Sequence, residues 1–178
     1  MEFDFARDVP ILERTPAVLK TLILGLDDGW TQPDYGPGTW SVHQVIGHLI
    51  HGERTDWLPR ARVILEQGEG GVFEPFDRAG HAALCREKSL PELLDIFAAE
   101  RAARLLELRG LNLGKADLLR RARHPVLGEA TLGQLLSTWV VHDLNHVAQV
   151  CKAMAYQHRV EVGPWERYLS ILAAPAPR

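Results

Sequence analysis

Residues 131–149 read TLGQLLSTWVVHDLNHVAQ, and the rest of the chain is organised around this stretch. Thr131 and Gln134 have the spacing of a capping box, in which a hydroxyl and an amide bind free N–H groups in the first turn of a helix. No proline follows, so the pattern predicts a helix that continues to about Tyr156 and is roughly 40 Å long. Most of its side chains are apolar, which favours a central place in the fold.

Three further helices are predicted from apolar residues at helical spacing, over residues 8–26, 41–67 and 89–110. The second and third begin with capping boxes at Ser41 and Ser89. Pro16 predicts a kink or a restart in the first helix, and Pro59 predicts a bend in the second.

The connections between these helices are long. Residues 68–89 are rich in glycine and charge, with a short helix expected near His81–Glu87, and residues 112–128 form a second irregular link. A short amphipathic helix is expected at residues 165–172, followed by a frayed tail rich in proline and alanine. Because no strand-like alternation is found, the sequence predicts an all-α four-helix bundle with long crossover connections and a short C-terminal helix.

The composition predicts a soluble, cytoplasmic protein with one domain, residues 1–178. At 46% hydrophobic content the chain is long enough for one well-formed core. A net charge of -3 argues against nucleic-acid binding, which draws its affinity from clustered Lys and Arg. The N-terminus lacks signal-peptide features, and no apolar run reaches the roughly 18 residues that span a bilayer. Cys85 and Cys151 are too few for a disulfide framework.

Two histidines of the central helix, His142 and His146, lie one turn apart on the same face. Neutral imidazoles at this spacing can bind a transition metal, although eight histidines give about 0.3 such pairs by chance. His48 faces inward from the helix over residues 41–67 and is the candidate third ligand, while His51 is a substitute ligand or a neighbour of the ligands. The competing interpretation is that these histidines are core residues satisfied by single hydrogen bonds.

Other metal and nucleophile patterns do not fit the sequence. A zincin needs His-Glu-x-x-His, but Asp143 follows His142 here, and the Glu-x-x-His tetrad of di-iron bundles does not occur. No serine or cysteine elbow with an adjacent base is found. Three histidines would leave positions at a zinc ion for water or substrate, and bound water would then have its pKa lowered towards about 7.

The order of short motifs resembles that of the DinB-like family, of the DinB and YfiT type. The matching residues are Thr39-Trp40-Ser41, Gly47-His48-Leu49, Glu53, Trp57, Arg60, His124-Pro125-x-x-Gly128, Thr131-Leu132, Trp139-Val140, His142-Asp143-Leu144-x-His146 and Gly163-Pro164-Trp165. The resemblance covers nearly the whole chain and implies a metal-dependent four-helix bundle. It also implies that His48, His142 and His146 hold the metal, and that the protein is a homodimer.

The resemblance implies an enzyme whose divalent metal activates a small thiol or water for transfer to, or hydrolysis of, a small electrophilic substrate. Zinc or nickel is the first expectation for the metal and manganese or iron the second, with a low-molecular-weight thiol as cosubstrate. Asn145 and Gln149 are candidates to orient a ligand or a bound water. The alternative function is a non-enzymatic, stress-associated protein that binds a metal or a small molecule.

Arg101 lies within the apolar stripe of the helix over residues 89–110 and needs a carboxylate partner, because an unpaired buried charge is costly. Glu53 and Asp143 are the candidate partners. We expect the three to form an ion-pair cluster that holds the helices together, in preference to a direct part in catalysis.

Overall fold

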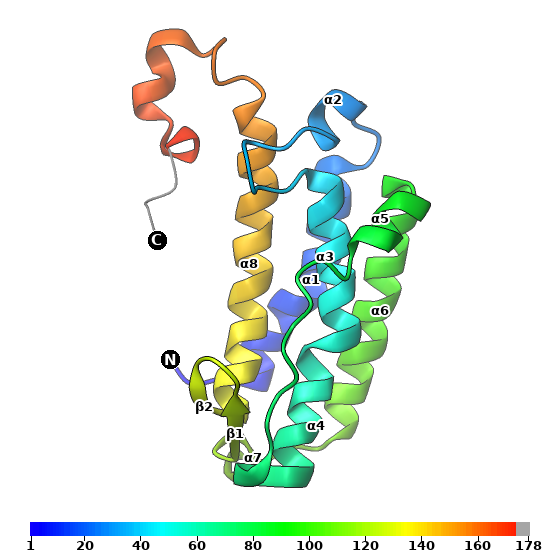
Figure 1. The fold of residues 1–178 in the computed structure, drawn as a ribbon, viewed down its shortest axis with the longest axis vertical. Coiled ribbons are helices and arrows are strands. Elements are labelled where there is room, and N and C mark those ends of the chain that lie inside the picture. Colours follow the sequence, from blue (N-terminus) through cyan, green and yellow to red (C-terminus); the bar gives the residue numbers. More distant parts are fainter. Residues whose placement is uncertain (174–178) are drawn as a thin grey trace.

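The computed structural model describes residues 1–173 and shows a bundle of long helices that lie side by side (Figure 1). The helices of the bundle are α1 (Phe5–Ile23), α3 (Val42–Thr55) continued by α4 (Trp57–Gln67), α6 (Leu90–Gly110) and α8 (Leu132–Tyr156). α1 and α3 each pack against both α6 and α8, so the bundle is roughly square in section. The expected four-helix bundle is confirmed.

Short elements fill the connections. They are α2 (Asp28–Thr31), η1 (Gly68–Gly70), α5 (Ala82–Glu87), α7 (Lys115–Leu118), η2 (Gly163–Tyr168) and η3 (Ser170–Leu172). The expected C-terminal helix is present as the two 3-10 helices η2 and η3. The tail rich in proline and alanine lies beyond Ala173, outside the described residues. Within residues 1–173, no helix combines the length and apolar character that crossing a membrane requires.

Helix α1 continues through Pro16, so of the two expectations, a kink or a restart, the restart is wrong. Proline has no N–H, so Pro16 leaves the carbonyl of Leu12, four residues earlier, without its helical partner. In the structure Arg101 Nη1 donates to Leu12 O over 2.7 Å. The proline therefore stays inside the helix because a side chain from α6 binds the carbonyl that the proline leaves free.

The helix expected over residues 41–67 is interrupted once, between α3 and α4. α3 ends at Thr55, Asp56 has φ -109° and ψ -71°, and α4 begins at Trp57. Pro59 is the third residue of α4, where its missing N–H removes no internal helical bond. The interruption at Asp56 lies in the turn before Pro59, where the proline cannot donate to the carbonyl of Thr55, four residues earlier.

The expectation that the chain has no strands is wrong. β1 (Arg121–His124) and β2 (Gly128–Thr131) form an antiparallel hairpin that leads directly into α8. The crossover after α4 joins this hairpin through a parallel bridge between Val72 and Arg123. The strands are four residues long and mostly charged or small, so they lack the alternation of apolar and polar residues by which a sequence indicates a strand.

The apolar core is divided into two clusters by a layer of polar residues. One cluster includes Leu105 and Trp139, and the other includes Phe97 and Val150. On α6, Arg101 lies between the positions of the two clusters, and on α8 Asp143 does so. The histidines of interest occupy the same part of the bundle.

Candidate metal centre

Three histidine side chains from two helices converge in the interior of the bundle. His48 Nε2 lies 3.2 Å from His142 Nε2, and His146 Nε2 lies 3.0 Å from the same atom. Each residue offers one ring nitrogen, and these nitrogens all lie within 4.8 Å of one another. The structure therefore brings together the three residues that the sequence selected. Their role as ligands stays a prediction.

Helix capping fixes the positions of these histidines. α3 begins with a complete capping box formed by Ser41 and Gln44, and α8 begins with one formed by Thr131 and Gln134. Both helices are uninterrupted through the site, so a spacing of four residues places the two α8 rings on one face.

Aromatic rings surround the three imidazoles. The ring centroid of Trp40 lies 4.6 Å from that of His48, and the Phe76 ring lies 5.5 Å from His48 on another side. Trp57 contacts His142 edge to face at 4.9 Å. His48 and His146 are 7% and 5% exposed, whereas His142 is only partly buried. Burial strengthens the electrostatic interactions that the first two can make.

Burial keeps the three imidazoles neutral. Burial, and after it repulsion from the neighbouring histidines, lowers the pKa of His48 to about 3 and that of His142 to about 2. Burial also lowers the pKa of His146, against the opposing effects of Gln149 and Asp143. At neutral pH each ring therefore has a lone pair that is available to a cation.

We expect the metal-free protein to lose stability as the pH falls from about 6.5 towards 3. In this range an unfolded histidine binds a proton and the buried one does not, so stability falls by about 1.4 kcal/mol per pH unit for each such histidine. Urea unfolding of the metal-free protein across this range measures the slope. His48→Gln removes one titrating ring and should make the slope of stability against pH less steep. An unchanged slope would show that His48 is not held neutral in the folded protein.

Gln149 holds His146 in the tautomer that binding requires. Its Oε1 lies 2.7 Å from His146 Nδ1, so that nitrogen donates the hydrogen bond and Nε2 keeps its lone pair. The structure thus places Gln149 beside a candidate ligand, as the sequence suggested. Asn145 is exposed and makes no hydrogen bond to the three histidines among the described residues. His51 packs against Phe76 and is not part of the cluster of converging nitrogens.

Gln149→Ala is expected to weaken metal binding by about 10- to 100-fold, which is the typical effect of removing a residue that orients a ligand. Asn145→Ala is the matched control from the same helix and should change the affinity little. A competition titration against a fluorescent zinc chelator measures both. Equal losses in the two variants would show that Gln149 has no special part in orienting His146.

The donor set fits a transition metal. A tetrahedral zinc ion with bonds of about 2.0–2.1 Å separates its ligand nitrogens by about 3.3 Å, close to the two separations of 3.0 and 3.2 Å observed here. Without a cation, His142 Nε2 can donate to only one of its two neighbours. Imidazole nitrogen suits zinc, nickel, copper and iron, whereas magnesium and calcium prefer oxygen ligands.

Arg101 forms the predicted ion-pair cluster. It donates from Nη1 to Asp143 Oδ2 over 2.5 Å and from Nη2 to Asp143 Oδ1 over 2.9 Å, and from Nη2 to Glu53 Oε1 over 2.8 Å. Trp139 Nε1 donates to the same Glu53 oxygen over 3.1 Å. Together with Leu12 O, these contacts join α1, α3, α6 and α8 through one guanidinium group. The hypothesis of a structural cluster is confirmed in its geometry.

The ion-pair cluster adjoins the histidines, because Asp143 directly follows His142 in the chain. Burial raises the pKa of Glu53, and Arg101 opposes that rise. Arg101 is 1% exposed and Asp143 is fully buried, so neither side chain is available to a substrate. Their contribution to the site is to fix the backbone that carries His142.

Sequence reasoning did not predict the aromatic wall of the site, which consists of Trp40, Trp57 and Phe76. Trp40 entered the sequence analysis only as part of the family motif, and Phe76 lies in a crossover without periodicity. The available signal was a tryptophan directly before the N-cap, Ser41, of a helix that carries an inward-facing histidine. His81 also lies near the site: it is 4% exposed, and its ring centroid lies 4.9 Å from that of Trp40.

Comparison with known proteins supports the fold and the family. A family model for the DinB superfamily matches residues 11–150. Relatives in Bacillus subtilis (YfiT) and Geobacillus kaustophilus each carry the name "putative metal-dependent hydrolase". They are 28% identical over 152 residues and 31% identical over 141 residues. The match to the Bacillus subtilis protein covers 80% of this chain and 79% of that protein. The match to the Geobacillus kaustophilus protein covers 76% of this chain and 75% of that protein.

The solved structure of Bacillus subtilis YfiT, described as having "an unusual four-helix bundle topology", superposes on this chain with a TM-score of 0.70. The match has 22% sequence identity and covers 88% of this chain and 87% of YfiT. Because the family model spans most of the sequence and the bundle agrees with that of a solved relative, the chain belongs to the DinB superfamily.

Proposed function

We propose that this protein is a metal-dependent enzyme in which His48, His142 and His146 hold one divalent cation. The observation that carries the proposal is the convergence of three neutral imidazole nitrogens inside an aromatic wall. Three protein ligands are typical of catalytic zinc, whereas structural zinc has four. Zinc or nickel is the metal that this donor set favours.

The reaction that fits such a site is attack on a small electrophilic substrate. A bound cation lowers the pKa of water or of a small thiol, which makes a nucleophile available at neutral pH. The residues of the chain supply the rest: Gln149 holds the tautomer of His146, and Trp40 and Phe76 pack against the ring of His48. Hydrolysis is the first candidate because the relatives carry the name of hydrolases. Thiol transfer is the second, since a thiol needs the same activation.

Metal content and turnover test the proposal together. The purified protein, stripped of metal and reloaded with zinc, nickel, manganese or iron, is assayed against a panel of esters, amides and lactones. A second panel combines low-molecular-weight thiols with model electrophiles. We expect one bound metal per chain and turnover in one panel.

The matched control is His158→Ala, because His158 is exposed and lies at the end of α8, outside the cluster. It should retain both metal and turnover, whereas His48→Ala should lose both. If metal binds stoichiometrically and neither panel reacts, the non-enzymatic binding protein becomes the better interpretation.

A further inference from the structure

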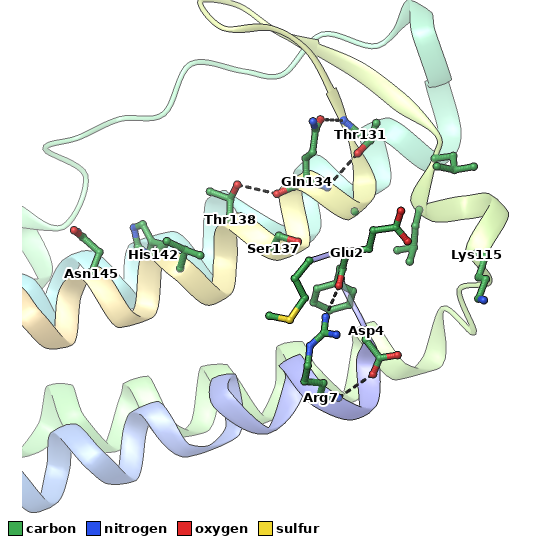
Figure 2. Close-up of a pocket in the computed structure, with 16 residues that line it drawn as sticks. Glu2, Asp4, Arg7, Lys115, Thr131, Gln134, Ser137, Thr138, His142 and Asn145 are labelled. Carbon is green, nitrogen blue, oxygen red and sulfur yellow. Dashed lines mark hydrogen bonds between the residues drawn. The ribbon is translucent and has the colours of Figure 1, made fainter.

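A groove runs along the outer face of α8 and ends at one of the candidate ligands. Its volume is about 1220 Å³, and it is bounded by the first residues of the chain, by α7 and by α8. Figure 2 shows Asn145 and His142 at one end of this groove, Ser137 near its middle and Lys115 at the far end. This volume slightly exceeds the roughly 300–1,000 Å³ typical of sites for small molecules.

The groove meets the proposed metal site at one residue, His142. His142 lines it, while its Nε2 atom lies beside those of His48 and His146. Along α8 the lining extends from Asn145 to Gly133, which is a distance of about 18 Å at 1.5 Å per residue. A molecule held in the groove would therefore have one end beside the histidines.

The walls of the groove are mainly apolar. Phe3, Leu118, Leu119 and Val141 line it, and the last two are 71% and 62% exposed, although they are large apolar side chains. Exposed apolar surface that adjoins a polar site is characteristic of a ligand groove.

Polar groups line the groove along α8 and at both of its ends. Ser137 near the middle and Asn145 beside His142 make no side-chain hydrogen bond within residues 1–173, so Asn145 is free to bind a polar head group. At the far end, Glu2 and Lys115 supply one charge of each sign and mark the opening to solvent. Asp4 and Arg7 are engaged at the start of α1, where Asp4 accepts from Arg7 N and Arg7 pairs with Asp8.

We propose that this groove binds the apolar chain of an elongated, amphipathic substrate whose polar reactive group lies beside His142 and Asn145. This inference rests on the proposed function, because it assigns the reactive end to the histidines. The substrate class is a small molecule with an alkyl, acyl or aryl tail. A small molecule fits better than a protein segment because the groove leads to a candidate ligand residue.

A series of alkyl hydroxamates tests the proposal with the zinc-loaded protein. The hydroxamate group chelates metals, so acetohydroxamate, hexanohydroxamate, octanohydroxamate and dodecanohydroxamate differ only in the length of the tail. Isothermal titration gives the affinity of each. We expect binding to tighten by up to about fourfold for each methylene buried, until the groove is filled.

Ser137→Trp should fill the middle of the groove and make the affinities for long and short hydroxamates nearly equal. Val141→Glu, at an exposed position, places a charge against the tail and should have the same effect if the tryptophan variant does not fold. Leu106→Trp is the matched control, because Leu106 is 73% exposed on α6, away from the groove. It should keep the full dependence on chain length.

A second measurement does not depend on the metal. The apolar fluorophore 1-anilinonaphthalene-8-sulfonate should bind the metal-free protein, and Ser137→Trp or Val141→Glu should abolish that binding. If acetohydroxamate fails to bind zinc-loaded protein, the proposed function fails. The groove is then supported if fluorophore binding is lost in these variants, and refuted if it is retained.

Two results would overturn the inference while the metal site stands. The first is tight binding of acetohydroxamate with no gain from longer tails. The second is a change from dimer to monomer in Ser137→Trp by sedimentation velocity, with the dependence on chain length unchanged. That result would assign the groove to a second copy of the chain.

Discussion

Arg101→Leu is expected to lower the free energy of unfolding by about 3–5 kcal/mol, which is the typical cost of removing one partner from a buried ion pair. The substitution leaves Asp143 and Glu53 as buried carboxylates without their cation. It also leaves Leu12 O without a donor, because Pro16 cannot supply one. Since native proteins are stable by about 5–15 kcal/mol, this loss threatens folding at physiological temperature.

Urea unfolding measures the loss, and Arg104→Leu is the matched control on α6. Arg104 pairs with Glu107 in a partly exposed position, so its loss should cost no more than about 1 kcal/mol. The loss in free energy of unfolding caused by Arg101→Leu should be smaller at acid pH. The reason is that buried carboxylates without a cation have raised pKa values and are protonated there. A variant with unchanged stability and lost turnover would contradict the structural role and indicate a direct part in catalysis.

His142→Ala is expected to abolish stabilisation by metal. A ligand that binds only the folded state at a thousand times its dissociation constant adds about 4 kcal/mol to the free energy of unfolding. His142 is the central member of the cluster, with Nε2 within 3.2 Å of both other Nε2 atoms. Without it, only the Nε2 atoms of His48 and His146 remain, and two ligands hold a cation much less tightly than three.

Unfolding with and without added zinc, together with elemental analysis, measures this effect. His43→Ala is the second comparison, because His43 is a buried histidine of α3 whose Nε2 contacts Lys88 O, away from the cluster. His43→Ala should be less stable than the parent both with and without zinc. Zinc should nevertheless raise its free energy of unfolding by as much as it does for the parent. Equal gains from zinc in His142→Ala would place the metal elsewhere.

Much of this architecture could be predicted from local sequence. Ser41, Ser89 and Thr131, each with Gln or Glu three residues later, all begin helices where expected, because a capping box is a local interaction. The approach of His48 to His142 and His146 was inferred from helix faces together with a family resemblance. Spacing alone was ambiguous, since a core histidine and a ligand have the same periodicity.

The features that were not predicted depend on contacts between distant parts of the chain. Pro16 stays within α1 because Arg101, 85 positions later, binds the carbonyl that it leaves free. The strand around Arg123 forms partly because residue 72 pairs with it. The groove requires Phe3 and Leu118 to meet α8, which no local pattern indicates.

The polar layer across the middle of the bundle restricts how the helices can slide. A displacement of α6 by one turn, about 5.4 Å, would carry Arg101 away from Glu53 and Asp143 and set it against leucines of one apolar half. The same holds for α3 and α8, which carry the two carboxylates. The ion pairs of this layer are therefore made in one longitudinal alignment of α3, α6 and α8. The same alignment brings the three imidazoles on α3 and α8 to one level along the bundle.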